Sequence, residues 1–133
     1  MAEAVQWQRA EGALVAAAGG AIYAFSGADY PWWGVAGLFL MPDLSFLAYG
    51  AGARVGAAVY NLMHLYGLGT SLLAMGFILG TPSLIAIGAL WLAHSGADRA
   101  FGYGLKTGKG FHHTHLGAIG PARRNMDSDL PKP

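Results

Sequence analysis

The chain has 133 residues, of which 54% are hydrophobic and 11% are charged, and its formal net charge is +1. Soluble domains carry about 25% charged residues, so the composition favours a membrane protein over a soluble helical bundle, and nucleic acid is not an expected partner. The absence of Cys excludes disulfides, zinc fingers and thiol catalysis.

Four apolar stretches follow one another along the chain, each near the length of about 20 residues that a membrane-crossing helix needs. They run from Glu11 to Phe25, from Trp32 to Tyr49, from Arg54 to Leu79 and from Pro82 to Tyr103. Short turns rich in Gly and Pro separate them. The sequence therefore predicts an all-α fold, a four-transmembrane-helix bundle in residues 1–110. A cytoplasmic tail, residues 111–133, follows and is expected to be largely disordered after residue 120.

The basic residues predict the orientation of this bundle. Arg9 precedes the first stretch, Arg54 lies between the second and third, and the other six Lys and Arg residues lie from Arg99 onward. Because basic residues favour the cytoplasmic side, we expect a multi-pass protein of the cell (inner) membrane with both termini cytoplasmic. The N-terminus lacks the features of a cleavable signal peptide, so the first stretch is expected to remain.

Small residues suggest how the helices pack and bend. Gly12, Ala16 and Gly20 are four residues apart and predict a smooth face for close helix contact. The third stretch is long, and Gly67 and Gly69 offer a place where it can bend.

Ionisable residues occur at similar depths in three of the four stretches. With a rise of about 1.5 Å per residue, Asp43 and Asp98 lie roughly 8–9 Å from the cytoplasmic boundary, and His64 and His94 roughly 14–15 Å. Asn61 and His64 share one helix face, as do His94 and Asp98. Charged groups are costly in hydrocarbon, so we expect them to converge on one interior pocket.

His and carboxylate side chains in this arrangement are typical ligands of zinc, manganese or iron. The sequence predicts a divalent metal site formed by Asp43, His64, His94 and Asp98. As a catalytic site it would use His64, His94 and Asp98, with Arg99 orienting an anion, although Arg99 is equally explained as a cytoplasmic anchor. Without a metal, the same groups would form a proton relay.

The C-terminal segment "GFHHTHLG" adds His112, His113 and His115, which could fold back over the pocket and supply a further ligand. A solvated tail is the simpler interpretation of these three residues.

Three functions remain open from the sequence. The first is a membrane enzyme with a hydrolase-like metal site. The second is a non-enzymatic accessory subunit of a larger membrane complex, which could ligate a haem or pigment through His64 or His94. The third is an ion- or proton-coupled carrier. The expected partners are the lipid bilayer and either further copies of the chain or a larger membrane complex.

The motifs "LFLMPDLSFLAYGAGARVGAAVYNLMH", "LAHSGADRAFGYGLK" and "THLG" carry a likeness that covers nearly all of residues 10–117. In these motifs the chain resembles a family of small bacterial integral-membrane proteins that is catalogued only as a domain of unknown function. The resemblance implies four membrane helices and no assigned activity. It implies these motif positions: Asp43, Asn61, His64, His94, Asp98, Arg99, Tyr103, Lys106 and His115.

A fainter similarity to membrane-bound metal-dependent hydrolases rests on the Pro42–Asp43 pair followed by His64. Ser45 stands where those hydrolases would have a second Asp. This similarity implies hydrolysis as the activity.

Overall fold

The computed structural model describes residues 2–121, 123 and 124, and within them it is helical apart from one short β-hairpin. The elements are α1 (Ala2–Ala24), α2 (Trp32–Leu40), the 3₁₀ helix η1 (Met41–Ala51), α3 (Ala53–Met63), α4 (Tyr66–Leu79), α5 (Pro82–Phe101), β1 (His113–Thr114) and β2 (Gly117–Ala118). The two strands pair antiparallel. The predicted all-α fold class is confirmed. Most of the segment predicted to be disordered, residues 122 and 125–133, lies outside the described residues.

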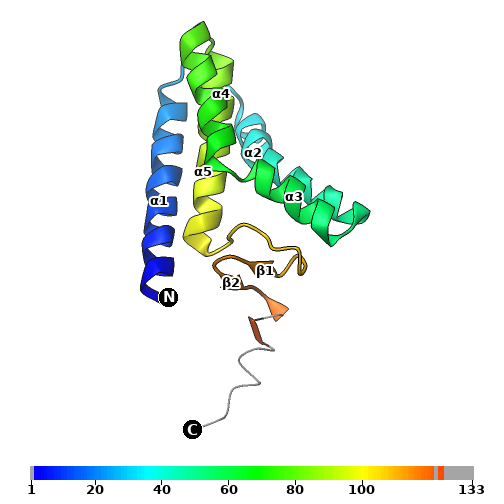
Figure 1. The fold of residues 1–133 in the computed structure, drawn as a ribbon. Coiled ribbons are helices and arrows are strands. Elements are labelled where there is room, and N and C mark those ends of the chain that lie inside the picture. Colours follow the sequence, from blue (N-terminus) through cyan, green and yellow to red (C-terminus); the bar gives the residue numbers. More distant parts are fainter. Residues whose placement is uncertain (1, 122, 125–133) are drawn as a thin grey trace.

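Helix α5 is the centre of the fold. It packs against α1 on one side and α4 on the other, and these three helices run side by side (Figure 1). The α2–η1 segment and α3 pack against each other as a hairpin that leaves the three-helix group at an angle (Figure 1). The N-terminus and the β-hairpin lie at the same end of the molecule, so the chain beyond α5 returns to the level where α1 begins.

The contact between α1 and α5 depends on glycine. A Cβ added to Gly96 would lie 2.5 Å from the backbone nitrogen of Ala16, and one added to Gly12 would lie 2.7 Å from the carbonyl oxygen of Gly96. The predicted small face is therefore correct at Gly12 and Ala16. It is wrong at Gly20, whose added Cβ would meet nothing within 4 Å, whereas Gly19 contacts α5.

Among the residues that the structure describes, two helical stretches are long and apolar enough to cross a membrane. They are Trp32–Ala51, which joins α2 and η1, and Ala53–Leu79, which joins α3 and α4. Many large apolar side chains lie on the outside, such as Trp32, which is 81% exposed, and Ile78, which is 82% exposed. Large apolar surfaces of this kind suit lipid or a partner better than water. The four crossings and the cytoplasmic termini stay predictions.

The third predicted stretch is broken at His64 and Leu65 rather than bent at Gly67 or Gly69. Helix α3 ends at Met63, Leu65 has an extended backbone, and α4 starts at Tyr66. Two side chains of α5 bind the carbonyl groups that the break leaves without helical partners. Trp91 Nε1 donates a hydrogen bond of 2.6 Å to the Met63 carbonyl, and the Arg99 guanidinium donates one of 3.5 Å to the His64 carbonyl.

Candidate metal centre

Helix α5 presents His94 and Asp98 one turn apart on the same face. His94 is only 3% exposed and packs edge-on against Phe39 of α2. Asp98 retains 17% of its side-chain exposure. The four-residue spacing aligns both side chains toward the end of α3, as the sequence predicts.

His64 enters the site from the break between α3 and α4. Its Nδ1 lies 2.9 Å from the carbonyl oxygen of Tyr60, and a carbonyl only accepts hydrogen bonds, so Nδ1 carries the hydrogen. Nε2 is then left with its lone pair directed at the other site residues. This pattern, in which the second ring nitrogen is held by a carbonyl, is common among metal-ligating histidines.

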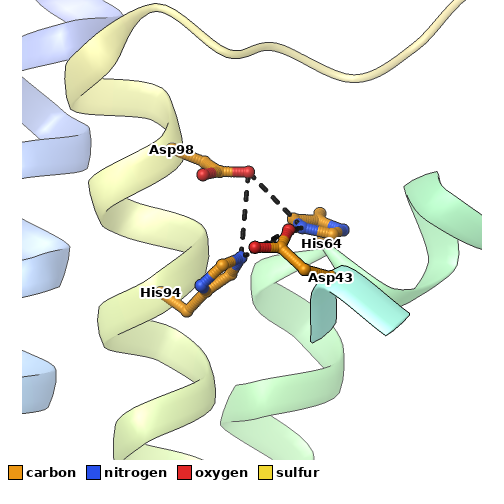
Figure 2. Close-up of side chains that lie close together, drawn as sticks. All are labelled: Asp43, His64, His94 and Asp98. Atoms are coloured by element: carbon orange, nitrogen blue, oxygen red, sulfur yellow. Dashed lines mark hydrogen bonds and ion pairs between the residues drawn. The ribbon is translucent and has the colours of Figure 1, made fainter. Parts of the chain in front are cut away.

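Asp43 lies in η1, where the chain changes from an α-helix to a 3₁₀ helix after α2. Pro42 has no backbone N–H and cannot continue the α-helical hydrogen bonding, and from Met41 the chain continues as a 3₁₀ helix. Pro42 is itself fully buried, which fixes the start of η1. The Asp43 carboxylate points toward the two histidines and keeps 31% of its exposure (Figure 2).

The four side chains converge on one point, as Figure 2 shows. The Nε2 atoms of His64 and His94 are 3.2 Å apart. Asp43 Oδ1 lies 3.5 Å from His64 Nε2 and 3.3 Å from His94 Nε2, and Asp98 Oδ2 lies 3.4 Å and 3.9 Å from the same two atoms. All four atoms lie within 4.8 Å of one another. Residues from η1, the end of α3 and α5 are therefore brought together as predicted.

These separations fit a metal ion. Four ligand atoms at about 2.0–2.1 Å from a tetrahedral zinc ion lie about 3.3 Å from one another. The separations that involve a histidine nitrogen run from 3.2 to 3.9 Å, so four of the five lie within about 0.2 Å of that value and the His94–Asp98 separation is about 0.6 Å longer. Two carboxylates face one space together with the two Nε2 atoms, and one cation at the centre would satisfy all four when both nitrogens present their lone pairs. The site could therefore hold a metal ion.

Tyr60 supports the centre from the side of α3. Its hydroxyl donates a 2.8 Å hydrogen bond to Asp98 Oδ2, the oxygen that faces the histidines. Its ring stacks on His64 at a centroid distance of 3.8 Å, and the residue is only 1% exposed. Tyr60 was not among the site residues predicted from the sequence, and its bond to Asp98 joins two residues that are 38 positions apart.

Replacing Tyr60 with Phe is expected to weaken metal binding by about tenfold, as loss of a hydrogen bond to a metal ligand commonly does. The ring still stacks on His64, so the fold is retained. Titration of the metal-free protein with Zn²⁺ in the presence of a competing chelator measures the change. Tyr103→Phe is the matched control, and an equal affinity for both variants would show that the bond to Asp98 has no part in metal binding.

Arg99 lies next to Asp98 in sequence but outside the four-residue cluster. It is 7% exposed, and its guanidinium donates hydrogen bonds to the carbonyl oxygens of Tyr103 and His64. Its charge also lies over the ring of Tyr66. In this position Arg99 joins the end of α5 to the break before α4.

The segment after α5 folds back along the bundle. Gly102 ends α5 with a positive φ of 91°. The Asn61 side chain then holds the main chain of Lys106 by two hydrogen bonds, of 2.9 Å to its carbonyl and 2.6 Å from its N–H. Lys106 also forms an isolated β-bridge with Thr114. The tail thereby comes to lie beside the centre.

Histidines of this tail do not join the cluster. Across the residues that the structure places, the donor group consists of Asp43, His64, His94 and Asp98 alone. His115 accepts a 2.8 Å hydrogen bond from the Leu105 N–H through Nδ1 instead. Other residues that follow α5 do reach the centre: Tyr103, Lys106, Phe111 and Ile119 line a pocket of about 300 Å³ together with Asp43, Phe46, Tyr60 and Asp98.

The bond between His115 and Leu105 should make the tail sensitive to acid. Burial and the nearby positive charge of Arg99 lower the pKa of His115 from its ordinary value of 6.5. The folded protein therefore binds this proton less readily than the unfolded chain. The contribution of His115 to stability is complete above the unfolded pKa and is lost as the pH falls toward the folded pKa.

Protection of the Leu105 amide against hydrogen exchange is expected to be lower at about pH 5.5 than at about pH 7.5, after correction for the intrinsic rate. In the His115→Ala variant, protection should be low at both values. A Leu105 amide that is equally protected at both pH values in the native protein would contradict this role of His115.

Comparison with known proteins agrees with the resemblance seen in the sequence. The family model described as Domain of unknown function (DUF4260) matches residues 5–119. That range contains the helices from α2 to α5, the β-hairpin and all four residues of the cluster. No curated protein and no solved structure matches the chain. Because the match covers most of the sequence, the chain belongs to the DUF4260 family of unknown function.

Proposed function

We propose that this protein is a membrane-embedded metalloenzyme, in which Asp43, His64, His94 and Asp98 hold one divalent transition-metal ion for a hydrolytic reaction. The observation that carries the proposal is the convergence of two imidazole nitrogens and two carboxylate oxygens, all within 4.8 Å, beside a pocket. Zinc is the first candidate among metals, because it accepts both ligand types in tetrahedral geometry. Manganese and iron share these ligands.

The two aspartates are suited to different roles. Asp98 is fixed by the Tyr60 hydroxyl and faces the histidines, so it serves as a ligand. Asp43 directs Oδ1 at both histidines and is more exposed toward the pocket, so its second oxygen can accept a proton. When bound, the metal ion supplies Lewis acidity toward an ester oxygen and toward water.

Hydrolysis then follows a balanced course. The oxygen of a water molecule forms a bond to the carbonyl carbon or phosphorus of the ester while Asp43 accepts a proton from that water. The bond between this centre and the ester oxygen breaks, and the proton passes from Asp43 to the departing alkoxide. The products are one acid and one alcohol, with Asp43 restored as a carboxylate.

We further propose that the bundle crosses the cell (inner) membrane four times, with both termini cytoplasmic. The two apolar stretches and the exposed apolar side chains support a membrane location, and the distribution of Lys and Arg supports this orientation. The pocket lies near the end that holds the N-terminus and the β-hairpin, so it would open toward the inner leaflet. Lipid is then the main partner, and assembly with further copies or other membrane subunits is compatible with this arrangement.

The geometry favours a metal ion over the other two functions considered from the sequence. A haem or pigment needs one or two histidines facing a flat apolar slot, whereas both Nε2 atoms here face each other and two carboxylates. A carrier needs polar groups along a whole path. The four ionisable side chains of the cluster lie together beside the break between α3 and α4 and do not form a path along the bundle.

The test is elemental analysis of the full chain purified in mild detergent without added metal or chelator. About one zinc, manganese or iron ion per chain is expected. The same sample should hydrolyse p-nitrophenyl esters of phosphate or short carboxylic acids, and chelation should remove this activity until metal is restored. A protein with no bound metal that also fails to take up zinc, manganese or iron from solution would overturn the proposal.

A further inference from the structure

Lys106 occupies an unusual place for a lysine. It is only 5% exposed, although it lies in the segment that follows the last helix. Its main chain is held by the Asn61 side chain and by the bridge to Thr114, so its position does not depend on its own side chain. The side chain lines the pocket and is available to bind a ligand there.

The ammonium group of Lys106 is surrounded mainly by aromatic rings. Nζ lies 4.2 Å from the centre of the Phe111 ring and 5.0 Å from that of Tyr60. Among the carboxylates that the structure places, none lies within the ion-pairing distance of 4.0 Å from Nζ. Burial lowers the pKa of Lys106, while Asp98 and Asp43 act in the opposite direction. The lysine is largely buried and its ammonium has no ion-pair partner among the described residues, so an anion in the pocket would be favoured beside it.

One wall of the pocket is aromatic and partly open. Phe46, Tyr103 and Phe111 line the pocket and are 38%, 46% and 37% exposed. Phe111 also packs edge-on against Phe46 at a centroid distance of 5.2 Å. A volume of about 300 Å³ suits a small head group and the first part of an apolar chain.

Charge decides which head group fits. With neutral histidines, Asp43, Asp98 and Lys106 together carry one net negative charge, which would repel an anion. A divalent ion held by the cluster would reverse the sum to one positive charge. An anionic oxygen could then approach the metal centre and the Lys106 ammonium together, as lysine commonly binds phosphate and carboxylate groups.

We propose that the pocket binds an amphiphilic anion, whose phosphate or carboxylate oxygens contact Lys106 and whose apolar chain lies against Phe46, Tyr103 and Phe111. This proposal rests on the proposed function, because it names the substrate class of the same site. The anionic group has two conceivable sources, a lipid-like ester or free phosphate, and the presence of the aromatic wall favours the lipid-like ester.

Hexyl phosphate, hexanol and inorganic phosphate are the probes, and their binding is measured calorimetrically on the zinc-treated full chain in neutral detergent. Because hexyl phosphate is itself an ester, release of inorganic phosphate is assayed in each sample and the titration is completed before hydrolysis is detectable. Lys106→Gln removes the charge, and the main-chain bonds to Asn61 remain because they do not use the side chain. Lys109→Gln is the matched control, since Lys109 is exposed in the same segment. Lys106→Arg retains the charge and is the control that separates loss of the charge from loss of the fold. Bound zinc is determined in every sample.

For the native protein and Lys109→Gln we expect binding of hexyl phosphate, weaker binding of inorganic phosphate and none of hexanol. Lys106→Gln should bind hexyl phosphate about tenfold more weakly, with its zinc content unchanged, and Lys106→Arg should recover part of the affinity. Equal affinity of Lys106→Gln and native protein, with zinc bound to both, would overturn the role of Lys106 and leave the metal centre standing.

Two other outcomes separate the proposals further. If the native chain holds no zinc but binds hexyl phosphate through Lys106, the metal centre is wrong and the anion site stands. If it binds neither, both fail. Inorganic phosphate that binds as tightly as hexyl phosphate would overturn the amphiphilic part of the proposal.

Discussion

The double variant His64→Ala/His94→Ala is expected to lose its bound metal, with an affinity for zinc lower by at least about 100-fold. Removing a single hydrogen bond to a metal ligand already costs about 10- to 100-fold, and this change removes two ligands themselves. The remaining Asp43 and Asp98 would hold zinc only through oxygen, which is a weaker set for this ion. Competitive titration of purified protein with a zinc-binding dye measures the difference.

The matched control is His112→Ala/His113→Ala, which removes the same number of imidazole groups from the tail. This control should bind zinc as the native protein does, because both residues lie outside the cluster. Circular dichroism establishes that each variant remains helical. If the tail variant lost zinc and the double variant of the cluster kept it, the histidines that hold the metal would be those of the tail.

Gly96→Leu is expected to destabilise the bundle by about 3 kcal/mol or more, which is the upper range for overpacking in a closely packed interior. A Cβ at this position would lie 2.5 Å from the nitrogen of Ala16 and 2.7 Å from the carbonyl oxygen of Gly12. Both atoms belong to the backbone of α1 and cannot move without separating the helices. Since His94 and Asp98 flank Gly96 on α5, the same change should also disturb the metal centre.

Gly20→Leu is the matched control for this prediction. Gly20 lies in α1, it is exposed, and an added Cβ would meet nothing within 4 Å. Leucine has the higher helix propensity at both positions, so the difference between the variants reports the contact of α1 with α5. Unfolding in mixed micelles of increasing SDS content measures both. Equal stability of the two variants would contradict the close packing of α1 on α5.

The convergence of the four site residues could be predicted because it depends on simple helix geometry. His94 and Asp98 are one turn apart in a continuous helix, and the depth of each group follows from its distance along the chain. These are local properties, so the sequence was sufficient for them.

The break at His64 could not be predicted in this way. Gly67 and Gly69 are the residues in that stretch that local preferences associate with bending, yet both lie within α4. The break is stabilised by Trp91 and Arg99, which bind the carbonyls of Met63 and His64 from 28 and 35 positions away. Contacts between residues so distant in sequence leave no periodic pattern to read.

The role of the tail was hidden for the same reason. From the sequence, the histidines of residues 112–115 were the candidates for a tail contribution to the metal site. In the structure, Lys106 and Phe111 are among the residues that line the pocket beside the metal centre. Their position depends on the two hydrogen bonds of Asn61 to Lys106, which span 45 positions. The sequence places Asn61 on one helix face with His64, and only the folded chain shows that its side chain holds the main chain of Lys106 beside the pocket.

X-ray absorption at the zinc edge of the zinc-loaded native protein tests the central claim most directly, namely that two histidines and two aspartates share one metal ion. We expect a shell of about four nitrogen and oxygen atoms near 2.0–2.1 Å, together with the outer-shell scattering of two imidazole rings. A shell of six oxygen atoms without imidazole scattering, or a spectrum unchanged in His64→Ala/His94→Ala, would contradict the account.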